Sequence, residues 1–130
     1  MIKFAYTIQY VQDVEKTLGF YEKAFGFSRK FVAPEKDYGE LITGETTLSF
    51  ASLQMADSNL KAGYIANSLA NKPFAMEIAF ATEDVETVVK EAIDAGAGLV
   101  AAPIKKPWGQ TVAYVRDPDG FLIEICTPIN

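Results

Sequence analysis

The chain of 130 residues has no histidine and a single cysteine, Cys126. Histidine is the commonest protein ligand for transition metals, and it exchanges protons near neutral pH. A histidine-based metal site is therefore excluded. A single cysteine cannot form a disulfide within the chain. A chain of this length buries enough surface to fold without a disulfide or a structural metal.

Basic residues and long apolar runs are also scarce. The chain has 12 Lys and Arg against 17 Asp and Glu, which gives a formal net charge of −5. Nucleic acid is bound by basic surfaces, so we expect no nucleic-acid partner. No apolar stretch approaches the roughly 20 residues that span a bilayer, and the first ten residues do not resemble a signal peptide. We therefore expect a cytoplasmic protein without a membrane partner.

An internal repeat organises the residues that are present. Hydrophobic residues make up 49% of the chain and charged residues 22%, as in a globular protein, and the length corresponds to one domain. Residues 4–15, FAYTIQYVQDVE, are similar to residues 74–86, FAMEIAFATEDVE. Both segments begin with Phe-Ala and end with Asp-Val-Glu. The repeat indicates two copies of one structural module.

Each copy predicts a helix that begins after an aspartate and ends at a glycine. The first helix is expected between Asp13 and Gly26, and the second between Asp84 and Gly96. The apolar residues of the first follow a helical spacing of four, three and four: Val14, Leu18, Tyr21 and Phe25.

Three strand patterns follow each predicted helix. They cover residues 27–33, 38–44 and 46–53 in the first copy, and 98–103, 110–117 and 121–128 in the second. We therefore predict an α+β fold of two tandem βαβββ modules that form an incomplete curved barrel with a central cleft. The modules cover about residues 3–52 and 74–128. The linker of about 53–73 is weakly patterned, which fits a functional loop or a plain connection.

The element order and two phrases, DVEKTLGFYEKAFGF and PWGQTVAYVRDPDGFLIEI, resemble the vicinal oxygen chelate superfamily. This family includes glyoxalase I, bleomycin resistance proteins, fosfomycin resistance enzymes and extradiol dioxygenases. The resemblance covers nearly the whole chain except the linker. Enzymes of the family hold a divalent metal with one side chain from each of four strands, usually His or Gln, Glu, His and Glu. The resemblance places these positions at Tyr6, Leu48, Glu77 and Glu124.

Two of these four positions lack a suitable metal ligand. Leu48 has no donor atom, and Tyr6 must lose a proton whose reference pKa is about 10. Two carboxylates can hold Mg²⁺ or Ca²⁺ loosely, but Zn²⁺, Ni²⁺ and Fe²⁺ favour imidazole or thiolate. We expect no tightly held metal cofactor, and a weakly bound divalent metal at Glu77 and Glu124 stays open.

Glu77 and Glu124 are the candidate catalytic residues. Burial of an unpaired charge is costly, so each glutamate is expected to face a wet cleft or to have a partner. If both face one cleft, their repulsion raises at least one pKa, which suits a general acid or base. The same pair suits a cationic ligand. Alternatively, each pairs with a cation such as Arg116 or Lys105.

Aromatic and apolar side chains complete the predicted ligand-binding set. The set is Tyr6, Leu48, Phe50, Glu77, Trp108, Tyr114 and Glu124. Trp108 is expected on a rim loop, where it closes over a ligand, anchors the core or contacts a second copy. Cys126 shares the strand face of Glu124, and a buried, inert thiol is the favoured interpretation.

Three functions fit these observations. The favoured one is a homodimeric, metal-free protein that binds a small organic molecule in the cleft, as bleomycin resistance proteins bind a cationic drug. The second is a metal-dependent, glyoxalase-like lyase or isomerase that uses Glu77 and Glu124. The third is a non-catalytic module with a vestigial cleft. The missing metal ligands and the acidic charge favour the first.

Overall fold

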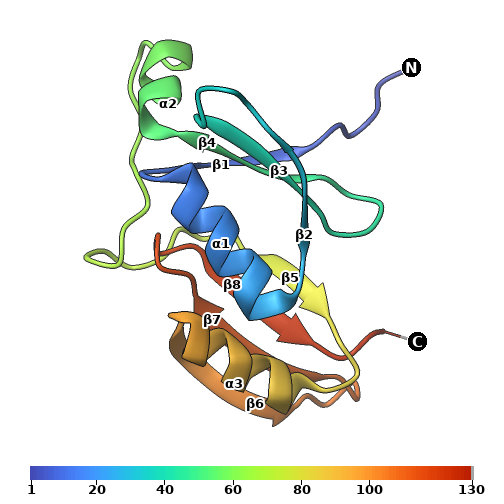
Figure 1. Cartoon of the computed structure of the whole chain (residues 1–130). Coiled ribbons are helices and arrows are strands. Elements are labelled where there is room, and N and C mark those ends of the chain that lie inside the picture. Colours follow the sequence, from blue (N-terminus) through green and yellow to red (C-terminus); the bar gives the residue numbers. More distant parts are fainter. Residues whose placement is uncertain (130) are drawn as a thin grey trace. The chain divides into compact units, whose positions relative to one another are not determined.

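The structure is a computed structural model, and it describes residues 1–129 (Figure 1). Two βαβββ runs follow one another, with a short helix between them. In order the elements are β1 (Thr7–Val11), α1 (Val14–Phe25), β2 (Ser28–Val32), β3 (Tyr38–Ile42), β4 (Leu48–Ser52), α2 (Leu53–Asn59), β5 (Ile78–Ala81), α3 (Val85–Ala95), β6 (Gly98–Lys105), β7 (Thr111–Arg116) and β8 (Leu122–Cys126).

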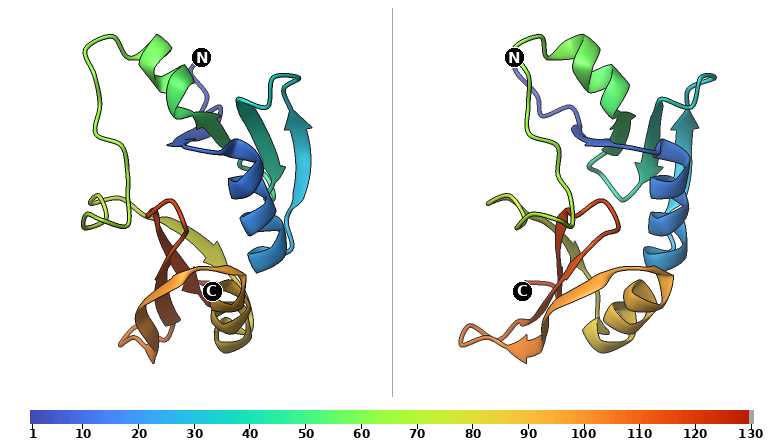
Figure 2. Two further views of the ribbon diagram at one scale, coloured as in Figure 1. Left: turned by 60° about the vertical axis from the view of Figure 1, so that its left-hand side comes forward. Right: turned by 90° about the vertical axis from the view of Figure 1, so that its left-hand side faces the viewer.

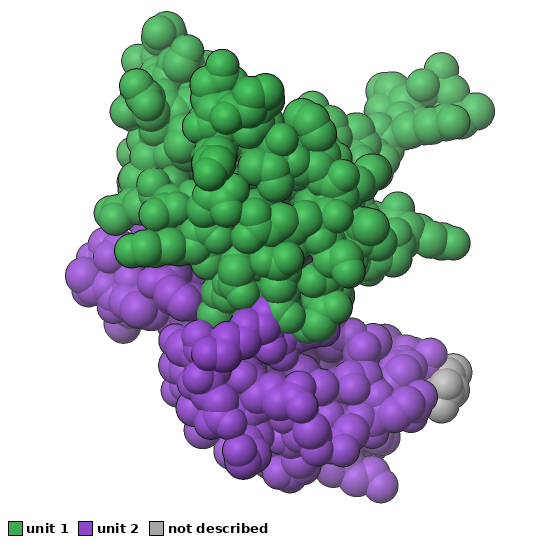
Figure 3. Space-filling model, viewed as in Figure 1, with its two compact units in different colours: residues 1–22, 26–66 green, residues 23–25, 67–130 purple. Residues whose placement is uncertain are grey.

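The chain divides into two compact units (Figure 3). Unit 1 comprises residues 1–22 and 26–66, and unit 2 comprises residues 23–25 and the chain from residue 67 onward. Each unit contains one four-stranded sheet, in the order β1-β4-β3-β2 or β5-β8-β7-β6. In both sheets the first strand pairs with the last strand in parallel, and the other pairs are antiparallel. The predicted α+β class with two tandem βαβββ modules is confirmed.

The two long helices begin and end at the predicted residues. The Asp13 carboxylate accepts from the backbone N–H of Lys16 at 3.1 Å, and α1 ends at Gly26, whose φ is 73°. The Asp84 carboxylate caps α3 in the same way. These contacts satisfy backbone donors that have no partner within the helix. Among residues 1–129, no helix is long and apolar enough to cross a membrane.

In unit 1, one face of the sheet packs against α1. The Phe50 ring is fully buried and lies 4.9 Å from the Tyr21 ring of the helix. Gly39, the cross-strand partner of Phe50, lies so close to the helix that an added Cβ would be 2.7 Å from Leu18. Because side chains alternate along a strand, Ser49, next to Phe50, points to the opposite face.

In unit 2, the same division holds between the two faces. Ile123 and Ile125 of β8 are buried, and α3 lies along the same sheet, next to β6, β7 and β8 (Figure 2). Buried residues of α3 include Val85 and Val89. The isoleucines of β8 therefore face the core, and Glu124 between them faces the opposite side.

Part of the predicted linker is helical. We expected weakly patterned chain over about 53–73, but residues 53–59 form α2. The Ser52 hydroxyl accepts from the backbone N–H of Met55 at 3.1 Å, and Ala56 is buried. A helix of under two turns carries too little periodicity to be recognised against small, polar neighbours.

Candidate functional site

The register of unit 2 brings three polar side chains to the face that α3 leaves uncovered. Glu124 of β8 pairs with Ala79 of β5 on one side and with Tyr114 of β7 on the other. Glu77 immediately precedes β5 and lies two residues before Ala79, so it shares that face. The predicted candidates Glu77, Tyr114 and Glu124 therefore lie together, on three different segments.

These side chains are in contact with one another. A hydrogen bond joins the carboxyl groups of Glu77 and Glu124. The Tyr114 hydroxyl donates to Glu124 Oε1 at 3.2 Å. Glu77 is exposed, whereas Glu124 and Tyr114 are half-buried. Two carboxyl groups can form such a bond only when one of them carries a proton.

The shared proton separates the pKa values of the two glutamates. The hydrogen bond to Glu124, burial and the charge of Glu124 together raise the pKa of Glu77 to about 7. Burial acts to raise the pKa of Glu124 as well, but hydrogen bonds from Glu77, Cys126 and Tyr114 outweigh it and lower that pKa. At neutral pH, Glu124 is therefore an acceptor, and Glu77 is divided between its acidic and ionised forms.

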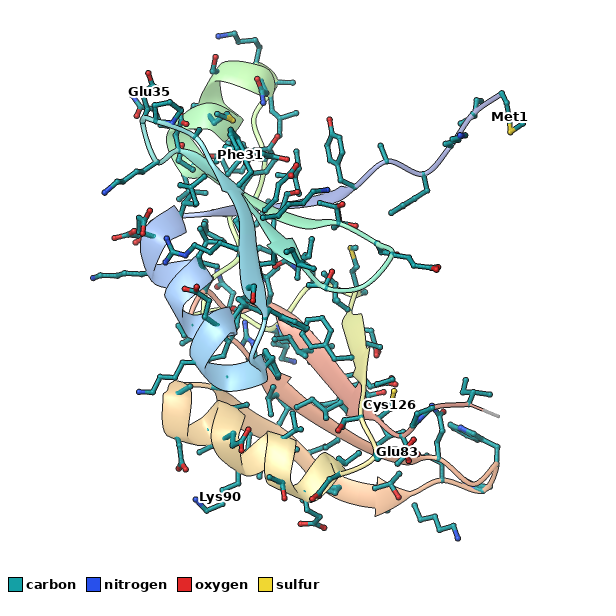
Figure 4. The ribbon with its side chains drawn as sticks, turned by 45° about the vertical axis from the view of Figure 1, so that its right-hand side comes forward. Met1, Phe31, Glu35, Glu83, Lys90 and Cys126 are labelled. Carbon is teal, nitrogen blue, oxygen red and sulfur yellow. The ribbon has the colours of Figure 1, made fainter. Side chains whose placement is uncertain are left out.

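The neighbouring hydroxyl and thiol stay protonated. Burial, followed by the charge of Glu77 and the bond to Glu124, raises the pKa of Tyr114. Burial and the bond to Glu124 raise the pKa of the Cys126 thiol to about 11. Cys126 is labelled in Figure 4, and its Sγ lies 3.7 Å from the Phe80 carbonyl oxygen. A buried thiol with this pKa is a poor nucleophile, as the sequence indicated.

Arg116 and Lys105, the predicted cationic partners of the two glutamates, do not have this role. The Arg116 guanidinium donates to the carbonyl oxygens of Gly120 at 2.9 Å and Ser68 at 3.0 Å, so it secures a turn. The positive charge that acts on Glu124 is that of Lys106, not Lys105. The principal partners of the glutamates are therefore each other and Tyr114.

The predicted counterpart of Glu124 in the first module is also corrected. Glu124 pairs with Ala79, two residues after Glu77, and Ser49 pairs with Ile8, two residues after Tyr6. Ser49, not Leu48, is therefore the equivalent position, and Tyr6 keeps its equivalence to Glu77. The alignment through the turn glycines failed because these glycines are not equivalent. Gly44 lies five residues before Ser49, whereas Gly120 lies four residues before Glu124.

Two of the predicted ligand contacts belong to the core instead. Leu48 and Phe50 lie on the α1 side of the sheet and are 4% and 0% exposed. Neither side chain is available to a ligand in unit 1. Tyr6 is 52% exposed. Trp108 is 68% exposed and donates to Gln110 Oε1 at 2.8 Å, which rules out a core anchor.

A second polar cluster, in unit 1, was missed by the sequence reasoning. The Tyr38 hydroxyl hydrogen-bonds to Glu40 Oε2 at 2.7 Å and to Ser49 Oγ at 3.1 Å. Glu40 pairs with Ser49 in the register, so it is the equivalent of Tyr114. The alternation of Tyr38 and Glu40 along one strand is the signal that could have revealed the cluster.

The donor set does not fit a tightly held transition metal. In the part of the chain that the structure describes, no group of three or more His, Cys, Asp or Glu side chains is placed to hold a metal ion. The four positions that the resemblance implied carry, with the corrected register, two phenolic or alcoholic hydroxyls and two carboxyls. The raised pKa of Glu77, about 7, further weakens this pair as a ligand set for a metal ion.

The chain is similar to known proteins in both its sequence and its fold. The family model of the Glyoxalase/Bleomycin resistance protein/Dioxygenase superfamily matches residues 3–125. The chain belongs to this superfamily. The structure of a glyoxalase-related enzyme from Fulvimarina pelagi has a TM-score of 0.81 at 23% identity, with 100% of this chain and 94% of that chain covered. That likeness confirms the fold of this glyoxalase-superfamily chain.

Relatives of the chain have names of different kinds. A virulence protein of Salmonella typhimurium is 29% identical over 119 residues, which covers 88% of this chain and 76% of the relative. A putative lactoylglutathione lyase of Brassica oleracea is 28% identical over 130 residues. That match covers 95% of this chain but only 43% of the plant protein. These names differ from one another and assign no activity to this chain.

Proposed function

We propose that this chain binds a small, oxygenated organic molecule on the uncovered face of the second sheet, without a tightly held metal. The observation that carries the proposal is the register that places Glu77, Tyr114 and Glu124 on one face, with the Tyr114 hydroxyl bonded to Glu124. A protonated carboxyl donates and an ionised one accepts, so the pair matches a ligand that offers a hydroxyl beside a carbonyl. The missing imidazole ligands support the metal-free part.

Two measurements on the purified protein test this proposal. Metal analysis is expected to find less than stoichiometric transition metal, and a stoichiometric, tightly bound ion would overturn the metal-free part. A thermal-shift screen of small, neutral hydroxyketones and hydroxyaldehydes is expected to give a stabilising ligand. The shift should be lost in Glu124→Gln and kept in Glu83→Gln, an exposed control in the same unit. A ligand that stabilises both variants equally would place the site elsewhere.

A second candidate is a glyoxalase-type lyase. The pKa of Glu77, about 7, suits a group that takes up and releases protons near neutral pH, and the name of the Brassica oleracea relative points to lactoylglutathione. An assay of lactoylglutathione formation and cleavage, with and without added Ni²⁺ or Zn²⁺, tests it. Activity that depends on the added metal and is lost in Glu77→Gln would favour this candidate over binding alone. No ligand and no activity would favour a non-catalytic module.

We also propose that two copies of the chain associate. Apolar side chains of the N-terminal segment support this, because Ile2 and Phe4 are 98% and 78% exposed. Exposed apolar side chains that gather on one segment favour an interface. We therefore propose a second copy of the same chain as the partner at this segment.

A further inference from the structure

We infer that the first module carries a site for an organic ammonium ion, centred on Glu40 on the face opposite α1. Glu40 lies in the middle of this face, with Phe31 of β2 directly opposite on one side and Ser49 of β4 on the other. Tyr38 lies next to it on its own strand. The site thus combines one carboxylate with aromatic rings on the same face.

A β-bulge brings the Phe31 ring to this face. The pairing of β2 with β3 shifts between Arg29 and Phe31, so these two residues lie on opposite faces despite their separation by a single residue. Arg29 consequently reaches Glu15 and Glu22 of α1. Without the shift, Phe31 would point toward the helix. Instead its ring is 51% exposed and lies on the face of its cross-strand partner Glu40.

The Glu40 carboxylate is oriented but not neutralised. Tyr38 donates to Oε2 at 2.7 Å, which leaves Oε1 able to accept from a ligand. The Tyr38 hydroxyl is itself held by Ser49, which is fully buried. Within residues 1–129, the ion pairs involve Arg29 and Lys90, and no lysine or arginine pairs with Glu40. Glu40 is half-buried, where an unmatched negative charge favours a cation.

The surrounding rings favour an alkylated cation over a bare metal ion. The Phe31 and Tyr38 ring centroids are 6.3 Å apart. Ring faces attract ammonium groups by cation–π interaction and contact their alkyl substituents. One carboxylate beside aromatic rings therefore matches a substituted ammonium ion.

The test is an NMR titration of the isotope-labelled chain with choline, and with its neutral isostere 3,3-dimethylbutan-1-ol. Choline is expected to bind in the millimolar range and to shift the signals of Phe31, Tyr38, Glu40 and Ser49. The alcohol should not. No shift at these residues, or equal shifts with both compounds, would overturn the proposal. Concentration-dependent shifts of Phe31 without added choline would identify a contact between copies instead.

Matched variants assign the binding to named residues. Glu40→Gln is expected to weaken choline binding at least about tenfold, because it removes a charged hydrogen-bond partner. Phe31→Leu, which keeps an apolar side chain on the exposed face, should weaken it about two- to fivefold. Glu45→Gln, in the exposed turn after β3, should leave it unchanged. Unchanged affinity in Glu40→Gln would overturn the site. Signals of residues 77, 114 and 124 report the second-module site separately in the same titration.

Discussion

At the scale of single residues, the glutamate pair makes the stability of the fold depend on pH. The pKa of Glu77 rises from 4.5 to about 7 on folding, so the native state holds a proton that the unfolded chain releases. The resulting stabilisation is fully present below pH 4.5 and is lost as the pH rises toward 7. Glu77→Gln should remove this loss.

Urea unfolding at several pH values between 4.5 and 8 measures this effect. In the wild type, the free energy of unfolding should contain a component that falls across this range, and the component should be absent in Glu77→Gln. Glu83→Gln should retain it. Parallel pH profiles for the wild type and Glu77→Gln would show that the proton is not shared.

The Phe50 side chain tests the difference between a core residue and a ligand contact. Phe50 is fully buried against Tyr21. Phe50→Ala should therefore lower the free energy of unfolding by about 3–5 kcal/mol, measured by chemical denaturation. Phe31→Ala, at a ring that is 51% exposed, should cost less than about 1 kcal/mol. Similar losses for both variants would contradict the assignment of the two faces.

The acidic cluster of the second module could be predicted from its residues, whereas the polar cluster of the first module could not. Glu77 and Glu124 could be predicted because the repeat and the alternation of β8 place them on one face. Ser49 could not, because Gly44 lies one residue farther from it than Gly120 lies from Glu124, and an error of one residue reverses the face of every side chain. The sharing of a proton depends on side-chain contacts, which no sequence pattern contains.

At the scale of elements, the caps decided which helices could be predicted. Asp13 and Asp84 mark α1 and α3 because long apolar stripes follow them, whereas the cap of α2, Ser52, precedes only seven helical residues. Isolated helices of that length are unstable in water. The helix α2 therefore depends on its cap and on the burial of Ala56.

Removal of the Ser52 cap should destabilise α2. Ser52→Ala is expected to cost about 1 kcal/mol and to increase amide hydrogen exchange over residues 53–59. Ser52→Asp preserves an acceptor and should rescue the protection. Ser58→Ala, at an exposed position of the same helix, serves as the control. Unchanged exchange in Ser52→Ala would mean that tertiary packing alone holds the helix.

At the scale of the whole molecule, the superfamily is established for this chain by a match over residues 3–125, and the element order was predictable from the repeat. The assembly was not predictable beyond the expectation of a homodimer. Light scattering after size-exclusion chromatography should give twice the chain mass of 14.2 kDa. A monomer at micromolar concentration would contradict it.

Charge substitutions in the N-terminal segment locate that interface. Ile2→Asp with Phe4→Asp should shift the chain to the monomer, because buried carboxylates would lack partners. Lys3→Asp changes the charge of the same segment without removing an apolar side chain, so it should leave the dimer largely intact. Equal dissociation by both variants would assign the effect to charge alone.

The corrected register has a consequence for protein engineering. Each sheet pairs its first strand with its last in the same offset, so Tyr6, Glu40 and Ser49 correspond one to one with Glu77, Tyr114 and Glu124. A side chain can thus be transplanted from one module to the equivalent position of the other, and the donor module serves as its reference. Ser49→Glu would give the first sheet the carboxylate of the second. The duplication makes the chain an internally controlled scaffold for building new binding sites.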